Sequence, residues 1–99
     1  MKSLEVVIES EAKSGLRNIY SYIRKGSETN ARIFKRDILG TIGKLSLNPQ
    51  KHPPDKFKRD NDGSYRAFEL YHVRITFHVS ESQITVIRIR HTKRNPIEY

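Results

Sequence analysis

The chain has 99 residues, with 19 Lys and Arg against 11 Asp and Glu, and therefore carries a formal net charge of +8. This length predicts one small domain over 1–99, with little room for a large cofactor cavity beside a hydrophobic core. The absence of cysteine excludes disulfides and Cys-ligated metal sites, and no apolar run reaches the roughly 20 residues of a membrane span. We therefore expect a cytoplasmic protein that binds anionic partners, although surplus Lys and Arg can also simply aid solubility.

The first half of the chain predicts one strand and two helices. Residues 4–8 are rich in β-branched side chains and predict a short strand. Apolar residues at three- and four-residue steps then predict a helix over 11–25, with Ser10 as N-cap and Gly26 as left-handed C-cap. Ser27 offers the N-cap of a second helix, which Asn48-Pro49 ends. The apolar stripe of this second helix is Ala31, Phe34, Ile38, Ile42 and Leu45.

Two glycines interrupt the second helical pattern. Gly40 and Gly43 each cost about 1 kcal/mol relative to alanine in a helix interior. Their presence predicts that this helix approaches the sheet closely or bends there.

The second half predicts a loop and three strands. Residues 50–56 contain two prolines and no apolar periodicity, which predicts a loop. Strand-like runs follow at 65–71, 73–79 and 83–90, and their short connections require antiparallel pairing. The expected fold is α+β in the order β-α-α-β-β-β, with the N-terminal strand and helical hairpin packed on a small antiparallel sheet. Alternating polarity over 73–79 predicts one core face and one face in water.

The cationic excess is spread along the chain, and six Lys and Arg residues lie on the predicted sheet or at its C-terminal end. Arginine offers a planar donor fork that matches phosphate or carboxylate, so an open cationic face is the candidate anion site. The alternative is that the strand arginines pair with Glu69 or Glu81, or solvate an edge. The candidate residues for this anion site, which could also bind an acidic protein segment, are Arg66, Arg74, Arg88, Arg90, Lys93 and Arg94.

Histidines supply the remaining acid–base candidates. His91 follows the last strand beside Lys93 and Arg94, where an imidazole could donate a proton to a leaving alkoxide. The alternative is a hydrogen-bonded surface residue. His78 is a further candidate, while Tyr99, as the last residue printed, is expected to be mobile unless it is docked.

Other kinds of site lack a signature in this sequence. The histidines are scattered, no dense acidic cluster suits Mg²⁺, and no P-loop or glycine fingerprint occurs. No serine lies in a nucleophile-elbow motif. We therefore expect no metal and no cofactor, and any catalysis would be acid–base chemistry on an anionic substrate.

Three consecutive strand motifs carry a family resemblance. The runs Tyr65–Leu70, Val73–Val79 and Ile84–Ile89, closing on His91-Thr92-Lys93-Arg94-Asn95-Pro96, together resemble the ParE/RelE superfamily of bacterial type II toxins. The helical half is similar to the ParE helical hairpin, and the resemblance covers nearly the whole chain. The long hairpin and the closing motif are more similar to the ParE branch.

The resemblance implies two different activities. ParE-like members inhibit DNA gyrase by protein–protein contact, which is the leading interpretation and would make the chain no enzyme. RelE-like members are ribosome-dependent mRNA endoribonucleases, and under that alternative the resemblance places phosphate-binding candidates at Arg66, Arg74 and Arg94. His91 is then the candidate general acid, and Glu69 or His78 the candidate base. Phe68 stands where that branch places a lysine, and Tyr99 matches its terminal tyrosine only after a one-residue shift.

The resemblance also implies the partners. These are a cognate acidic antitoxin, in a possible toxin–antitoxin hetero-oligomer, and DNA gyrase as target, or the ribosome and mRNA under the alternative. The antitoxin could bind at the anion site named above. The family is associated with plasmid stabilization. A second alternative, drawn from charge alone, is a basic nucleic-acid-binding module that does not act as a toxin.

Overall fold

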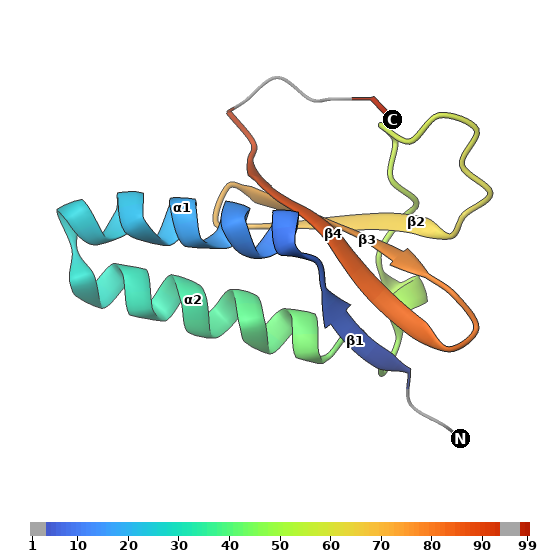
Figure 1. The fold of residues 1–99 in the computed structure, drawn as a ribbon, viewed down its shortest axis with the longest axis horizontal. Coiled ribbons are helices and arrows are strands. Elements are labelled where there is room, and N and C mark those ends of the chain that lie inside the picture. The colour runs from blue at the N-terminus through green and yellow to red at the C-terminus, as the bar shows by residue number, and fades with distance from the viewer. Residues whose placement is uncertain (1–3, 94–97) are drawn as a thin grey trace.

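The computed structural model describes residues 4–93 and 98–99. Its elements follow the predicted order: β1 (Glu5–Ile8), α1 (Ser10–Gly26), α2 (Glu28–Gly43), a single 3₁₀ turn (Pro49–Lys51), β2 (Tyr65–Leu70), β3 (Val73–Val79) and β4 (Gln83–His91). Figure 1 shows α1 and α2 side by side, with the connection between them pointing away from the sheet. The predicted α+β class is therefore confirmed.

The N-terminal strand extends the sheet. The strand order is β1-β4-β3-β2, in which β2, β3 and β4 form the expected antiparallel meander and β1 pairs in parallel with β4. Val6 lies opposite Ile84, and Ile8 lies opposite Val86. The sheet is thus mixed and four-stranded, because the two helices form the crossover that a parallel pair requires.

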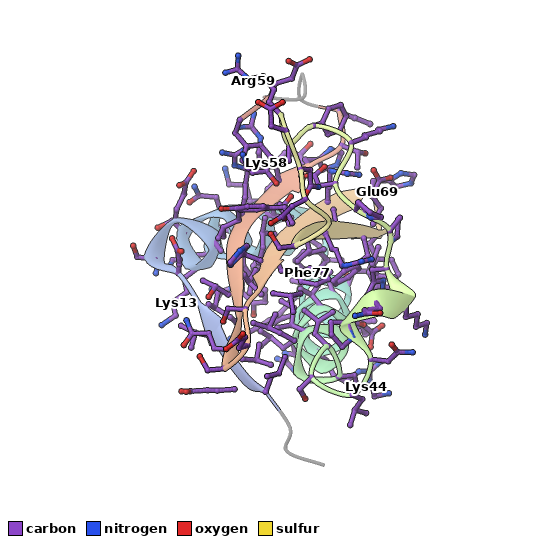
Figure 2. The ribbon with its side chains drawn as sticks, turned by 90° about the vertical axis from the view of Figure 1, so that its right-hand side faces the viewer. Lys13, Lys44, Lys58, Arg59, Glu69 and Phe77 are labelled. Atoms are coloured by element: carbon purple, nitrogen blue, oxygen red, sulfur yellow. The ribbon has the colours of Figure 1, made fainter. Side chains whose placement is uncertain are left out.

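The hydrophobic core lies between the helices and one face of the sheet. Phe77 is fully buried in this core, and Figure 2 shows it near the middle of the molecule, while Lys58 and Arg59 lie at one end. We call this helix-covered side the inner face and the opposite side the outer face. The core side chains are Ala12, Phe34, Ile38, Ile42, Leu45, Val73, Ile75, Phe77, Ile84, Val86 and Ile89.

The helix ends differ in detail from the prediction. Ser10 is the first residue of α1 and Glu9 is its N-cap, while Gly26 belongs to the helix instead of adopting a left-handed C-cap. Ser27 instead ends α1 in an extended conformation and caps α2, where its Oγ accepts a hydrogen bond from Asn30 N at 3.1 Å. One extended serine therefore serves both helices, which leaves no need for a glycine at positive φ.

The close approach to the sheet predicted at the two glycines of α2 is wrong. The helix ends at Gly43, before Asn48-Pro49, and a Cβ built on Gly40 or Gly43 would meet nothing within 4 Å. The close approach occurs at Gly15 of α1, where a Cβ would lie 2.3 Å from the carbonyl oxygen of Ile89. The glycine that allows helix and sheet to touch is therefore in the first helix.

The β2–β3 turn and the edge of β2 are each held by contacts with other segments. Tyr71 and His72 form the β2–β3 turn with φ of 54° and 60°, and the Tyr71 hydroxyl donates to Asp37 Oδ2 of α2. On the far edge, Pro54 forms a β-bridge with Arg66, so residues 53–55 cover the otherwise open edge of β2.

The predicted water-facing side of the sheet is partly covered. Ala67 and Thr76 are opposite each other on the outer face, yet only 2% and 4% of their surfaces are exposed. The loop that contains Asp55 and Phe57, together with Tyr99, lies against this face through the contacts described below. The expectation of a fully wet face is therefore wrong, because the loop after α2 folds back over the strands.

Candidate functional site

A β-bulge decides which arginines share the outer face. Thr76 pairs with Arg88 and Phe77 pairs with Val86, so Ile87 has no partner in β3. Because side chains alternate along a strand, this extra residue reverses the parity and places Arg88 on the outer face while Val86 stays in the core. By the same register, the outer face comprises Tyr65, Ala67 and Glu69 of β2, Arg74, Thr76 and His78 of β3, and Thr85, Arg88 and Arg90 of β4.

Arg74 is held by two carboxylates and an aromatic ring. Its Nη2 donates to Asp55 Oδ1 at 2.7 Å, and its Nη1 donates to Glu69 Oε2 at 2.9 Å. Its guanidinium carbon lies 4.9 Å from the centre of the Phe57 ring, which adds a cation–π contact. The Asp55 side chain is 1% exposed and that of Arg74 is 20% exposed, so this ion pair is largely shielded from water.

Tyr99 closes the site above Asp55 and Arg88. Its hydroxyl donates to Asp55 Oδ2, its main-chain N–H donates to the Phe57 carbonyl at 3.1 Å, and Arg59 N donates to its carbonyl at 2.7 Å. The Arg88 guanidinium carbon lies 5.1 Å from the centre of its ring. Tyr99 is therefore docked on the outer face by both its backbone and its side chain.

The environment fixes the charge states of Asp55 and Tyr99. Burial acts to raise the pKa of Asp55, but the hydrogen bonds from Tyr99 and Arg74 outweigh it, so that pKa is lowered overall and the carboxylate is ionised. Burial, then the hydrogen bond to Asp55, raises the pKa of the Tyr99 phenol. The site therefore holds one buried anion between a neutral phenol and a cation.

Arg66 lies on the inner face, away from Arg74. It is opposite Phe77, and its Nη1 donates to the carbonyl oxygen of His52 at 2.6 Å. The His52 ring packs 4.8 Å from the Phe68 ring, and burial, followed by nearby Lys51 and Arg66, lowers the pKa of this imidazole. The sheet therefore separates Arg66 from the outer-face arginines.

The other acid–base candidates are also divided between the two faces. Glu69 and His78 share the outer face with Arg74, and the His78 ring lies 4.5 Å from the Tyr65 ring. His91 is opposite Val73 on the inner face, where its Nδ1 accepts a hydrogen bond from Lys93 N at 3.1 Å. Arg94 lies outside the described residues. The structure thus brings Arg74, Glu69 and His78 to one face, and Arg66 and His91 to the other.

A concave surface lies between α1 and the end of β4, apart from the outer-face site. This α1–β4 groove has a volume of about 610 Å³, and among the described residues its charged lining side chains are Lys25, Arg90 and Lys93, beside His91. Tyr22 is 75% exposed at this surface. The lining residues are Gly15, Asn18, Ile19, Ser21, Tyr22 and Lys25 of α1, with Ile89, Arg90, His91 and Lys93.

The sequence did not predict that Asp55 and Phe57 belong to the outer-face site around Arg74. Both lie in a stretch without periodicity, so no local pattern predicts that they contact β3. The available signal was a carboxylate and an aromatic residue shortly after two prolines, close in sequence to the arginine-containing strands.

Within residues 4–93 and 98–99, no group of three His, Asp or Glu side chains could hold a metal ion, and no helix is long and apolar enough to cross a membrane.

The fold matches solved toxin–antitoxin structures. The chain is similar to one from the chromosomal ParDE system of P. aeruginosa, with 17% identity, a TM-score of 0.71 and coverage of 92% of this chain and 98% of that one. It is also similar to a chain of the toxin–antitoxin complex RelBE2 from Mycobacterium tuberculosis, with 15% identity, a TM-score of 0.63 and coverage of 92% and 93%. The chain therefore shares its fold with these two structures.

The family follows from the sequence itself. A sequence model described as the ParE toxin of the type II toxin–antitoxin system parDE matches residues 6–96. The chain belongs to the ParE toxin family, which confirms the resemblance drawn from the strand motifs. A search of curated protein sequences found no significant match.

Proposed function

We propose that this protein is a toxin that inhibits DNA gyrase by protein–protein contact. The observation that carries the proposal is the division of the ribonuclease candidates between two faces of the sheet: Arg74 lies on the outer face, while Arg66 and His91 lie on the inner face. Phosphoryl-transfer catalysis requires its groups to converge on one phosphate. Membership of the ParE family supports the same choice.

We further propose that a cognate acidic antitoxin neutralises the toxin. The two similar structures are described as a ParDE system and a toxin–antitoxin complex, and the net charge of +8 favours an acidic partner. Lys25, Arg90 and Lys93 line the open α1–β4 groove, whereas Arg74 already has carboxylate partners. The α1–β4 groove is therefore a stronger candidate than the outer face for binding an acidic segment of the antitoxin.

A supercoiling assay tests the gyrase proposal. Purified protein is added to gyrase, relaxed plasmid and ATP, and we expect loss of supercoiled product at near-stoichiometric ratios. A small basic protein of similar charge, such as egg-white lysozyme, controls for coating of the DNA. Full supercoiling at a large excess of folded toxin contradicts the proposal.

The ribonuclease alternative is tested in the same preparation. The outer face does place Glu69 and His78 on the side of Arg74, so translating ribosomes with a defined mRNA provide the parallel assay. Under the gyrase proposal the mRNA remains intact, and induced cells show DNA damage. Cleavage of the mRNA at ribosome-bound codons identifies the RelE-like activity instead.

Charge reversal tests the antitoxin groove. The probe is the acidic protein encoded beside the toxin gene, if one is present there, and binding is measured by calorimetry at low and high salt. We expect the double variant Lys25→Glu, Lys93→Glu to bind more weakly and with less salt dependence. The double variant Lys13→Glu, Arg17→Glu reverses two charges as well, at exposed positions of α1 outside the groove, and is the matched control. Equal loss in both variants indicates a general charge effect.

A further inference from the structure

Three arginines lie close together on the outer face. Arg74 and Arg90 are directly opposite each other in β3 and β4, and Arg88 is opposite Thr76, two residues along each strand. Like charges in facing positions are destabilising unless an anion compensates for them. The phosphates of a nucleic acid are the external anions that such a cluster favours.

A carboxylate of the chain already occupies this cluster. Asp55 is 2% exposed, and its two oxygens accept hydrogen bonds from Arg74 Nη2 and from the Tyr99 hydroxyl. The other terminal nitrogen of Arg74 is bound to Glu69, and the Phe57 ring lies beside the guanidinium. A phosphate can therefore take the position of Asp55 on Arg74 only by displacing that carboxylate.

Tyr99 covers the neighbouring arginine. Its ring lies 5.1 Å from the Arg88 guanidinium carbon and 5.8 Å from the centre of the Tyr65 ring. Among the described residues, the buried Nε atoms of Arg74 and Arg88 have no hydrogen-bond partner. The face therefore offers more donors than its own carboxylates satisfy, as a site for a larger anion would.

We infer that Asp55, held in place by Tyr99, is an internal anion that excludes nucleic acid from Arg74 and Arg88 of the outer face. Asp55 is then a specificity-determining residue: it keeps a basic protein from acting as a general polyanion binder and leaves other surfaces to make protein contacts. The inference concerns the outer face alone and does not depend on gyrase being the target.

An RNA titration tests the inference. Binding of a short fluorescein-labelled single-stranded RNA is followed by anisotropy at low and moderate salt for the wild-type protein, Asp55→Asn and Glu81→Gln. The matched control Glu81→Gln also removes one negative charge, from the exposed turn before β4. We expect Asp55→Asn to bind at least about tenfold more tightly than Glu81→Gln, with a steeper salt dependence. Adding Arg74→Ala should remove the gain, and equal binding by Asp55→Asn and Glu81→Gln overturns the inference.

A measurement on the wild-type protein covers the case in which Asp55→Asn does not fold. The asparagine can still accept the hydrogen bond from Phe57 N, so circular dichroism is expected to show a native fold. In the wild-type protein, the Nε–Hε NMR signals of Arg74 and Arg88 should stay in place as RNA is added, while signals of exposed cations shift. Early movement of the Arg74 signal overturns the inference whatever the variant does.

Discussion

The Arg74 guanidinium and the Asp55 carboxylate, 19 residues apart in the chain, form an ion pair of 2.7 Å on the outer face of the sheet. Tyr99, 44 residues from Asp55, donates to the other carboxylate oxygen. This relationship joins the loop after α2, the beginning of β3 and the last residue printed, and the first two predictions depend on it.

Truncating Asp55 should destabilise the fold. Asp55→Ala removes the acceptor of three donors, from Arg74, Tyr99 and Phe57, and leaves the Tyr99 hydroxyl without its partner. We expect a loss of about 2–4 kcal/mol in the free energy of unfolding, measured by urea denaturation. Glu81→Ala, in an exposed turn, is the control and should change stability by less than about 0.5 kcal/mol. Equal stability of the two variants contradicts the role given to Asp55.

Acid should weaken the protein through the same carboxylate. The folded-state pKa of Asp55 lies below the ordinary value of 3.8. Its ionised form therefore contributes full stability above that value, and the contribution is lost as the pH falls through the folded-state pKa. The melting temperature of the wild-type protein should fall steeply below about pH 4. In Asp55→Asn, the melting temperature should decrease less over the same pH range. If the melting temperatures of both proteins decrease equally with falling pH, the effect belongs to other carboxylates, such as Asp37 and Asp62, whose pKa values are also lowered.

Two glycine substitutions should have opposite effects. Gly15→Ala places a methyl group 2.3 Å from the Ile89 carbonyl oxygen, so α1 must move off β4, at a cost of about 1–3 kcal/mol. Gly40→Ala has open space around it in the interior of α2 and should stabilise the fold by about 0.5–1 kcal/mol. Thermal or urea unfolding of the two variants gives the comparison. A destabilising Gly40→Ala would mean that its surroundings are tighter than the structure shows.

Ser27→Ala should remove the cap shared by the two helices. The serine Oγ accepts from Asn30 N, and no other acceptor is placed there among the described side chains. We expect a loss of about 1 kcal/mol, while Ser27→Asp should retain most of the stability because aspartate is also a good N-cap. Ser14→Ala, at an exposed position inside α1, should have little effect. If Ser27→Asp loses as much as Ser27→Ala, the serine acts through packing.

Local patterns predicted the parts of this fold that depend on neighbouring residues. The helical faces, the turn at Tyr71-His72 and the three strands of the meander are each encoded within a few residues, and their predicted positions agree with the structure to within a few residues. The order of these motifs also indicated the ParE family. The end of α2 was less predictable, because its apolar pattern continues to Leu45, which packs in the core from a turn outside the helix.

The sequence by itself determined the order of the elements, the positive charge and the family, because periodicity, composition and motif order are read along the chain. Tertiary structure alone decided which charges meet. The unpaired Ile87 turns Arg88 outward, strand register places Arg66 on the face opposite Arg74, and a loop without periodicity brings Asp55 under Tyr99. These outcomes depend on contacts between distant segments, since a single-residue shift in register reverses the face of every following side chain.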